Sequence, residues 1–222
     1  MMQPDHSTRP DGRNIFLINA HQPYPFSKGE LNRTLADRAR RHFESQGDTV
    51  RETAMQDTID VDGEVEHHVW ADLVFLQMPV NWMGVPWTFK RYMDLVYTAG
   101  MDGRMCHGDG RTRRDPTRQY GLGGALTDVH YALSLTLNAP EMAFNDPTQR
   151  FFAGMSVDQL LAPMHLNFKF FGMQPLETFA CHDVMKNPKI ADDLARFDGY
   201  LTRLSAATER SMRMHATAGA AE

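Results

Sequence analysis

The sequence predicts an α/β domain built on a doubly wound parallel sheet. Short apolar runs alternate along the chain with longer amphipathic segments, which is the pattern of strands joined by crossover helices. The chain has 222 residues, 42% of them hydrophobic, and this is enough for one domain with a sizeable core. No internal repeat or low-complexity linker divides it. We therefore expect one domain with helices on both faces of its sheet.

The elements begin as strand, helix and strand, which is the start of a βαβ unit. The apolar runs predict five strands, at residues 14–20, 48–53, 73–78, 131–136 and 174–180. The amphipathic segments predict helices at residues 28–46, 61–69, 86–97, 158–171 and 188–210. Residues 99–129 form a long insertion rich in Gly, Arg and Asp, and loops of such length are usually functional or mobile. We expect the domain to span residues 14–210, between a disordered tail at 1–13 and a flexible tail at 211–222.

The composition argues against several classes of partner and site. A net charge of -5 and a pI near 6.0 give no electrostatic reason to bind nucleic acid. The N-terminal segment lacks the apolar stretch of a secretory signal, and no apolar run approaches the roughly 20 residues that span a bilayer. We expect a cytoplasmic protein without stable membrane insertion. Cys106 and Cys181 are far apart and the histidines are scattered, so neither a disulfide nor a metal site is expected.

Residues 77–94, with the sequence QMPVNWMGVPWTFKRYMD, are the first candidate site. They begin where the third expected strand ends, and in an open parallel sheet ligands bind outside the carboxyl ends of the strands. Trp82 offers a flat face, Gly84 lets a backbone approach closely, and Pro86 suits the start of a helix. The segment therefore indicates a pocket for a planar group. The alternative is a buried turn in which the aromatic side chains only fill the core.

A second signal lies in the first turn, AHQPYPFSKGELNRTL, at the start of the first expected helix. Ser27 and Glu30 have the spacing of a capping box, and the free backbone donors of a helix N-terminus suit a phosphate. His21 and Lys28 strengthen this interpretation. The turn is neither the GxGxxG fingerprint of dinucleotide-binding folds nor a Walker loop. An ordinary capped helix is the alternative.

A third signal is QYGLGGALTDVHYALSLTLNAP, which contains the fourth expected strand and the turn after it. Thr136 and Asn138 could hydrogen-bond the edge of a planar ligand, or the strand could simply end in a polar residue and a proline. The carboxyl ends of parallel strands share one sheet edge. Together the three loops could supply a phosphate site, a face for a flat ring and polar groups at its rim. Flavin is the natural candidate.

In five sequence segments the chain resembles the flavodoxin-like NAD(P)H:quinone oxidoreductases, and within them most closely the modulator of drug activity B proteins. The segments are SKGELN, QMPVNWMGVPWTFKRYMD, DGRTRRDPTRQYGLGG, LSLTLNAPEMAF and FFGMQPLETF, and the resemblance covers residues 14–203. It implies a flavodoxin-like fold with five parallel strands in the order 2-1-3-4-5. It also implies a homodimer in which the second subunit completes the flavin pocket.

The resemblance implies an enzyme that binds FAD non-covalently and reduces quinones to hydroquinones with NADPH or NADH. A hydride would pass through the flavin in a ping-pong order, with the quinone entering after the nicotinamide leaves. Residues 27–34 would hold the phosphates, and residues 80–83 and 136–139 would bracket the ring. The cofactor-binding residues expected on this basis are His21, Ser27, Lys28, Gly29, Glu30, Leu31, Asn32, Arg33, Thr34, Val80, Asn81, Trp82, Met83, Tyr120, Thr136, Leu137, Asn138 and Ala139.

The chain departs from the family at two aromatic positions. It reads Val80-Asn81-Trp82 where the family commonly has Gly-Trp-Trp, and Leu137 where the family has Trp. Loss of these rings would change the width of the pocket, so the substrate preference of other members does not transfer. Asn81 marks the position where substrate choice is expected to differ.

Tyr120 is the expected catalytic residue. Its hydroxyl would hydrogen-bond the quinone or the flavin rim and assist protonation of the hydroquinone, and a purely structural tyrosine is the alternative. The nearby basic run around Arg113 could bind the extra phosphate of NADPH, or be a solvated loop or a subunit contact. Two other functions stay open at this point. They are an electron-carrier flavodoxin and a regulatory flavoprotein subunit of a membrane transporter.

Overall fold

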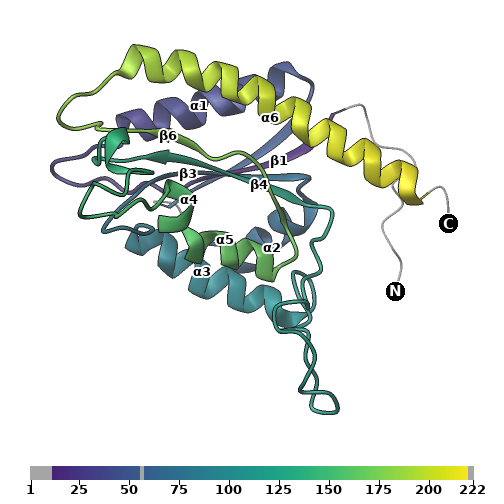
Figure 1. The fold of residues 1–222 in the computed structure, drawn as a ribbon. Helices are drawn as coiled ribbons and strands as arrows, with labels where there is room; N and C mark the ends of the chain where they lie inside the picture. The colour runs from purple at the N-terminus through teal and green to yellow at the C-terminus, as the bar shows by residue number, and fades with distance from the viewer. Residues whose placement is uncertain (1–11, 56–57, 220–222) are drawn as a thin grey trace.

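The computed structural model describes residues 12–55 and 58–219 and shows one parallel sheet between two layers of helices (Figure 1). The strand order is β2-β1-β3-β4-β5, with β6 also paired to β4. This confirms the predicted flavodoxin-like order and adds a sixth strand. The strands are β1 (Asn14–Asn19), β2 (Thr49–Ala54), β3 (Leu73–Pro79), β4 (His130–Thr136), β5 (Gln174–Pro175) and β6 (Phe179–Cys181).

Helices cover both faces of the sheet (Figure 1). One face carries α1 (Glu30–Ser45) and α6 (Ile190–Gly219). The other face carries α2 (Val61–Trp70), α3 (Trp87–Ala99) and α5 (Ala162–Phe170), with the short helix α4 (Val157–Leu160) leading into α5. Two 3-10 helices, η1 and η2, lie at Gly100–Asp102 and Glu141–Ala143.

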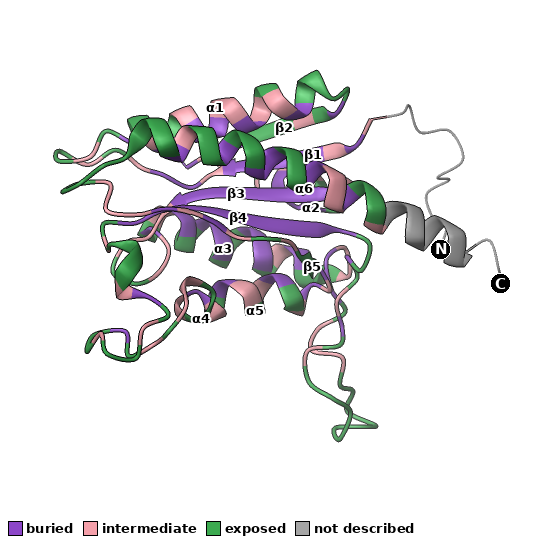
Figure 2. Ribbon diagram, turned by 45° about the horizontal axis from the view of Figure 1, so that its top comes forward, coloured by how far each residue is buried: buried purple, intermediate pink, exposed green. Residues whose placement is uncertain are grey.

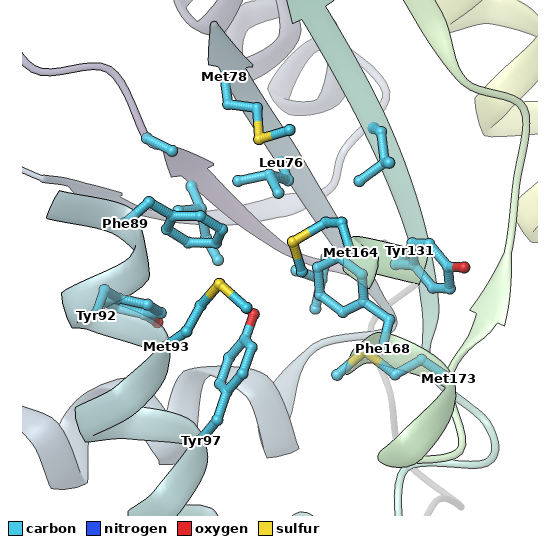
Figure 3. Packing of buried hydrophobic residues seen from close by; sticks show 14 of the residues in the cluster. Leu76, Met78, Phe89, Tyr92, Met93, Tyr97, Tyr131, Met164, Phe168 and Met173 are labelled. Atoms are coloured by element: carbon cyan, nitrogen blue, oxygen red, sulfur yellow. The ribbon is translucent and has the colours of Figure 1, made fainter. Parts of the chain in front are cut away.

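The central strands β3 and β4 are buried along almost their whole length, because helices pack on both of their faces (Figure 2). On the side of α1 and α6, the Phe75 ring contacts the rings of Phe43 and Phe197. On the other side, methionines such as Met93 and Met164 fill the space between aromatic rings (Figure 3). This packing fixes the carboxyl ends of the strands, from which the candidate loops begin.

Residues 100–129 leave the domain at the opposite end of the sheet from the candidate loops. The helix α3 returns from the carboxyl edge of the sheet and ends at Ala99, and β4 begins at His130, so the insertion starts and finishes at the amino-terminal edge. A β-bridge between Cys106 and Gly124 closes its base. Its tip projects away from the domain (Figure 1).

Two expected elements are each divided in two. The strand expected at 174–180 consists of β5 and β6. Pro175 pairs with Tyr131 and Phe179 pairs with Ser134, so four residue spacings on this strand lie opposite three on β4. The extra residue bulges out and interrupts the pairing. The helix expected at 158–171 consists of α4 and α5, which break at Leu161, where φ is -97° and ψ is 19°.

The domain extends past both of its expected boundaries. Arg13 is buried, its guanidinium lies 2.5 Å from the Asp48 carboxylate, and it donates to the backbone oxygen of Ser205. At the other end, α6 continues beyond residue 210, and the Ser211 hydroxyl lies 2.8 Å from Nε2 of His130. Arg13 and Ser211 therefore belong to the domain rather than to tails. Residues 1–11 and 220–222 of the expected tails lie outside the described residues.

No helix within residues 12–55 and 58–219 is long and apolar enough to cross a membrane. Over the same stretches, no three His, Cys, Asp or Glu side chains come together as a metal site. Cys106 and Cys181 are both buried free thiols.

Candidate functional site

A hollow of about 740 Å³ opens at the carboxyl-terminal edge of the sheet. Its walls are the turns after β1, β3 and β4 and the segment between β6 and α6. In a parallel sheet of this order, successive connections turn to opposite faces between β1 and β3, which leaves a crevice at that edge. The fold itself therefore places a ligand-sized space where the three candidate loops converge.

The N-terminus of α1 reaches this hollow without a side-chain cap. Gly29 occupies the cap position with φ 77°, and because it has no side chain it caps none of the first N–H groups of the helix. Ser27 is instead held outside the helix by two backbone hydrogen bonds with Tyr24, of 2.8 and 3.0 Å. The predicted capping box of Ser27 and Glu30 is therefore wrong. The free N–H groups and the positive end of the helix dipole suit an anion.

His21 packs directly against this helix terminus. A Cβ on Gly29 would lie 2.1 Å from two atoms of the His21 ring, so only glycine leaves room for the imidazole. His21 is 7% exposed, and its Nε2 has no hydrogen-bond partner among the described residues. Burial and the charge of Arg33 lower the pKa of His21, while a hydrogen bond with the Ser27 backbone opposes them. A neutral imidazole with an unsatisfied nitrogen therefore borders the hollow.

The turn after β3 is tight and strained. Backbone hydrogen bonds of 2.9 Å join Asn81 and Gly84 in both directions, and Trp82 and Met83 between them have φ 48° and 61°. This left-handed conformation costs roughly 1–2 kcal/mol for a residue with a side chain. The turn leaves Trp82 95% exposed. Backbone strain of this kind clusters at functional sites.

A second hollow, of about 1020 Å³, adjoins the first. Tyr24, Phe26 and Asn81 line both, whereas Trp82 and Trp87 line the second. The Asn81 amide donates to the Tyr24 hydroxyl over 3.3 Å, and the rings of Tyr24 and Phe26 stack with their centroids 5.4 Å apart. Asn81 and Tyr24 therefore form a partition between the two hollows.

A layer of polar side chains lies buried beneath the first hollow. Gln77 of β3 donates to the side-chain oxygen of Asn32 over 2.9 Å, and Asn32 of α1 donates to the Thr136 hydroxyl of β4 over 3.2 Å. Ser134 pairs with Gln77 across the two strands and is also buried. Within the described part of the chain, its hydroxyl has no hydrogen-bond partner. Burial of polar side chains destabilises the fold unless they are hydrogen-bonded. The hydrogen bonds that connect Gln77, Asn32 and Thr136 offset this loss of stability.

The structure brings most of the predicted cofactor residues together. Those that line the first hollow are His21, Ser27, Lys28, Gly29, Glu30, Leu31, Asn32, Val80, Asn81, Thr136 and Asn138. Trp82 lines the second hollow. The predicted residues that line neither are Arg33, Thr34, Met83, Leu137, Ala139 and Tyr120.

Arg33 and Thr34 turn away because neighbouring positions on a helix face in different directions. Leu137 is buried in the apolar core and does not line the first hollow. Thr34 donates back to the Glu30 carbonyl oxygen within α1.

Tyr120 lies away from both hollows. It stands in the insertion at the amino-terminal edge of the sheet and is 66% exposed. The Arg111 guanidinium lies 5.4 Å from the centre of its ring, and the Phe170 ring is beside it. Tyr120 lines neither hollow of its own chain, because the insertion meets the start of β4 rather than its end.

Two parts of the site escaped the sequence prediction. The first is the aromatic pair of Tyr24 and Phe26, for which a signal existed, since Pro25 between them marks a tight turn beside the phosphate segment. The second is the apolar side chains of the segment after β6, which no motif marks. They are Val184, Met185 and Ile190.

The chain matches the flavodoxin-like fold family over residues 13–203. It is 44% identical to an uncharacterized protein of Schizosaccharomyces pombe, over 79% of this chain and 89% of that protein. It is 40% identical to the NADPH:quinone oxidoreductase MdaB of Haemophilus influenzae, over 86% of this chain and 98% of that enzyme.

Solved structures with low sequence identity share the fold. One is an NAD(P)H:quinone oxidoreductase from Methanothermobacter marburgensis, with a TM-score of 0.61 and 14% identity over 87% of this chain and 99% of that one. Another is general stress protein 14 from Treponema denticola in complex with FMN, with a TM-score of 0.57 and 20% identity over 86% and 97% of the two chains.

Proposed function

The chain belongs to the flavodoxin-like fold family, and we propose that it is a flavin-dependent NAD(P)H:quinone oxidoreductase. The similarity to the Haemophilus influenzae NADPH:quinone oxidoreductase supports this activity, because 40% identity extends over most of both chains. The substrates that follow are a quinone and a nicotinamide nucleotide. We also propose that the enzyme works in the cytoplasm.

One observation in the structure carries the proposal. An uncapped helix terminus with an unsatisfied His21 Nε2 stands at the same sheet edge as the strained turn that presents Trp82. Phosphate suits the first feature, and a flat ring suits the second. The residues present therefore fit FAD. The first N–H groups of α1, with Lys28 and His21, would hold its pyrophosphate, and the turns after β3 and β4 would hold its ring.

A bound flavin supplies two-electron hydride chemistry between a nicotinamide nucleotide and a quinone. The residues of this chain bind, orient and shield. Burial lowers the pKa of His21, so the neutral imidazole adds no charge, and in the tautomer protonated at Nε2 it donates a hydrogen bond to a phosphate. Asn81 presents its amide at the partition between the hollows, where it can meet a carbonyl oxygen of a quinone. Donor and acceptor would occupy the second hollow in turn, which gives a ping-pong order.

We propose FAD rather than FMN because donors surround the phosphate end from more than one side. The N–H groups of α1, the Lys28 ammonium and His21 line that end together, and a pyrophosphate offers more acceptor oxygens to such a set than a single phosphate does.

The proposal includes a homodimer in which Tyr120 of the partner subunit completes the site. The insertion projects from the domain and does not line the hollows of its own chain. It also exposes Tyr120 and Leu122, which would be buried in a contact with another copy. In that contact the Tyr120 hydroxyl would hydrogen-bond the quinone or the flavin rim.

A pair of histidine variants tests the proposed site. FAD is titrated into apoprotein carrying His21→Leu or, as a control, His42→Leu, which removes a half-buried histidine near the far end of α1. We expect His21→Leu to raise the dissociation constant of FAD by about tenfold or more, because a hydrogen bond to a charged group is lost. His42→Leu should bind FAD as the wild type does. Equal affinity in both variants would contradict the assignment of His21, and a wild-type protein that reduces no quinone would contradict the function.

A further inference from the structure

We propose that Gln77 is a positioning residue that holds the phosphate-binding and ring-binding ends of the site in register through Asn32. This inference rests on the proposed flavin site and adds to it a residue that lines neither hollow. Gln77 lies wholly inside the protein, with 0% exposure.

The buried network joins the three elements that carry the three loops of the site. Gln77 belongs to β3, whose end leads into the Trp82 turn. Asn32 belongs to the first turn of α1, next to the free N–H groups. Thr136 is the last residue of β4, just before the turn that contains Asn138. The hydrogen bonds of 2.9 Å and 3.2 Å therefore tie the helix terminus to both strand ends.

Gln77 has a mixed environment. Along β3 its neighbour on the same face is the apolar Phe75, whereas its register partners in the adjoining strands are the polar Asn19 and Ser134. Neither partner bonds to the Gln77 side-chain oxygen within the described residues. Met has a volume similar to that of Gln and fills the same space without the amide. The amide at this position is explained by its hydrogen bond to Asn32.

Gln77 acts through its neighbours because it cannot touch a ligand in either hollow. Asn32 and Thr136 line the first hollow, and Gln77 bonds to Asn32 from below. Without the Gln77 amide, the Asn32 oxygen retains only the Thr136 hydroxyl at 3.4 Å. The helix terminus and the strand ends can then shift against each other. A ligand that spans both ends loses affinity, whereas a ligand that touches one end does not.

The test compares a whole ligand with its two halves. Apoprotein is titrated with FAD, with ADP for the phosphate end and with riboflavin for the ring end, in the wild type and in Gln77→Met. We expect the dissociation constant of FAD to rise about three- to tenfold, the equivalent of one network hydrogen bond. ADP and riboflavin should bind both proteins alike. Ser134→Ala is the matched control, because it removes a buried hydroxyl that faces Gln77 and has no partner among the described residues.

A second pair of variants keeps the test decisive if Gln77→Met does not fold. Thr136→Val removes the hydroxyl that accepts from Asn32, and Thr136→Ser keeps it. We expect Thr136→Val to weaken FAD binding and Thr136→Ser to retain it. The inference is overturned if the wild type binds FAD and Gln77→Met binds it equally well, or if all three ligands weaken together. A wild-type protein that takes up no FAD overturns the proposed function itself.

Discussion

Replacement of Gly29 by Ala should destabilise the fold and disrupt the phosphate end of the site at once. Gly29 caps α1 with φ 77°, and a Cβ there would lie 2.1 Å from Cε1 and Nδ1 of His21. The left-handed backbone costs about 1–2 kcal/mol for a residue with a side chain. The displacement of a packed ring costs about 1–3 kcal/mol more. We therefore expect the free energy of unfolding to fall by about 2–5 kcal/mol.

A second glycine separates the two contributions. Gly47 also has a positive φ, of 86°, but a Cβ there would meet no atom within 4 Å. Gly47→Ala should therefore lose only the backbone contribution of about 1–2 kcal/mol. Chemical denaturation of the two variants measures the difference, which reports the collision with His21.

The same pair of variants reports on the site. The displaced His21 ring borders the first hollow, so we expect Gly29→Ala to weaken FAD binding by about tenfold or more, as removal of the His21 hydrogen bond does. Gly47→Ala should leave FAD binding unchanged. Equal losses of unfolding free energy in the two variants, or an unchanged FAD affinity in Gly29→Ala, would refute the reasoning.

Three further predictions concern buried charge, pH and the insertion. Asp48→Ala leaves Arg13 buried and unpaired, so we expect denaturation to show a loss of about 3–5 kcal/mol and the added change Arg13→Met to recover part of it. Burial lowers the pKa of His68 to about 4, so as pH falls from 6.5 the unfolded chain takes up this proton first and stability declines. The free energy of unfolding should fall by about 3 kcal/mol between pH 6.5 and pH 4. Urea titrations of His68→Gln should show a shallower dependence of this free energy on pH, and an equal slope in the variant and the wild type would contradict the role of His68. Tyr120→Phe should slow quinone-dependent NADPH oxidation without changing FAD affinity, and unchanged quinone turnover would remove Tyr120 from the site.

The strands were predictable because buried parallel strands leave continuous apolar runs in the sequence. The run at 73–78 became β3 and the run at 131–136 became β4, and the resemblance supplied their order. The division of 174–180 into β5 and β6 was not predictable, because a bulge depends on the register against β4. The break of the helix at Leu161 had a local signal, because Pro163 cannot donate a backbone hydrogen bond to the preceding turn and suits the start of a new helix.

The loops of the site were predictable, but the directions of their side chains were not. Thr136 faces the hollow and Leu137 the core, although both belong to one quoted string. Ser27 has the spacing of a cap, yet the Tyr24 turn withdraws it and leaves Gly29 in that place. Tyr120 lies in a quoted string too, but chain topology places it at the other edge of the sheet. Local patterns do not contain such long-range information.

The most direct test of the central claim is to purify the protein, identify the flavin that denaturation releases, and reduce the bound flavin anaerobically with NADPH and with NADH before adding a quinone. We expect FAD to be released, its absorbance to bleach with a nicotinamide nucleotide, and the colour to return when the quinone is added. A colourless protein that takes up no flavin, or a bound flavin that neither nucleotide reduces, would contradict the claim.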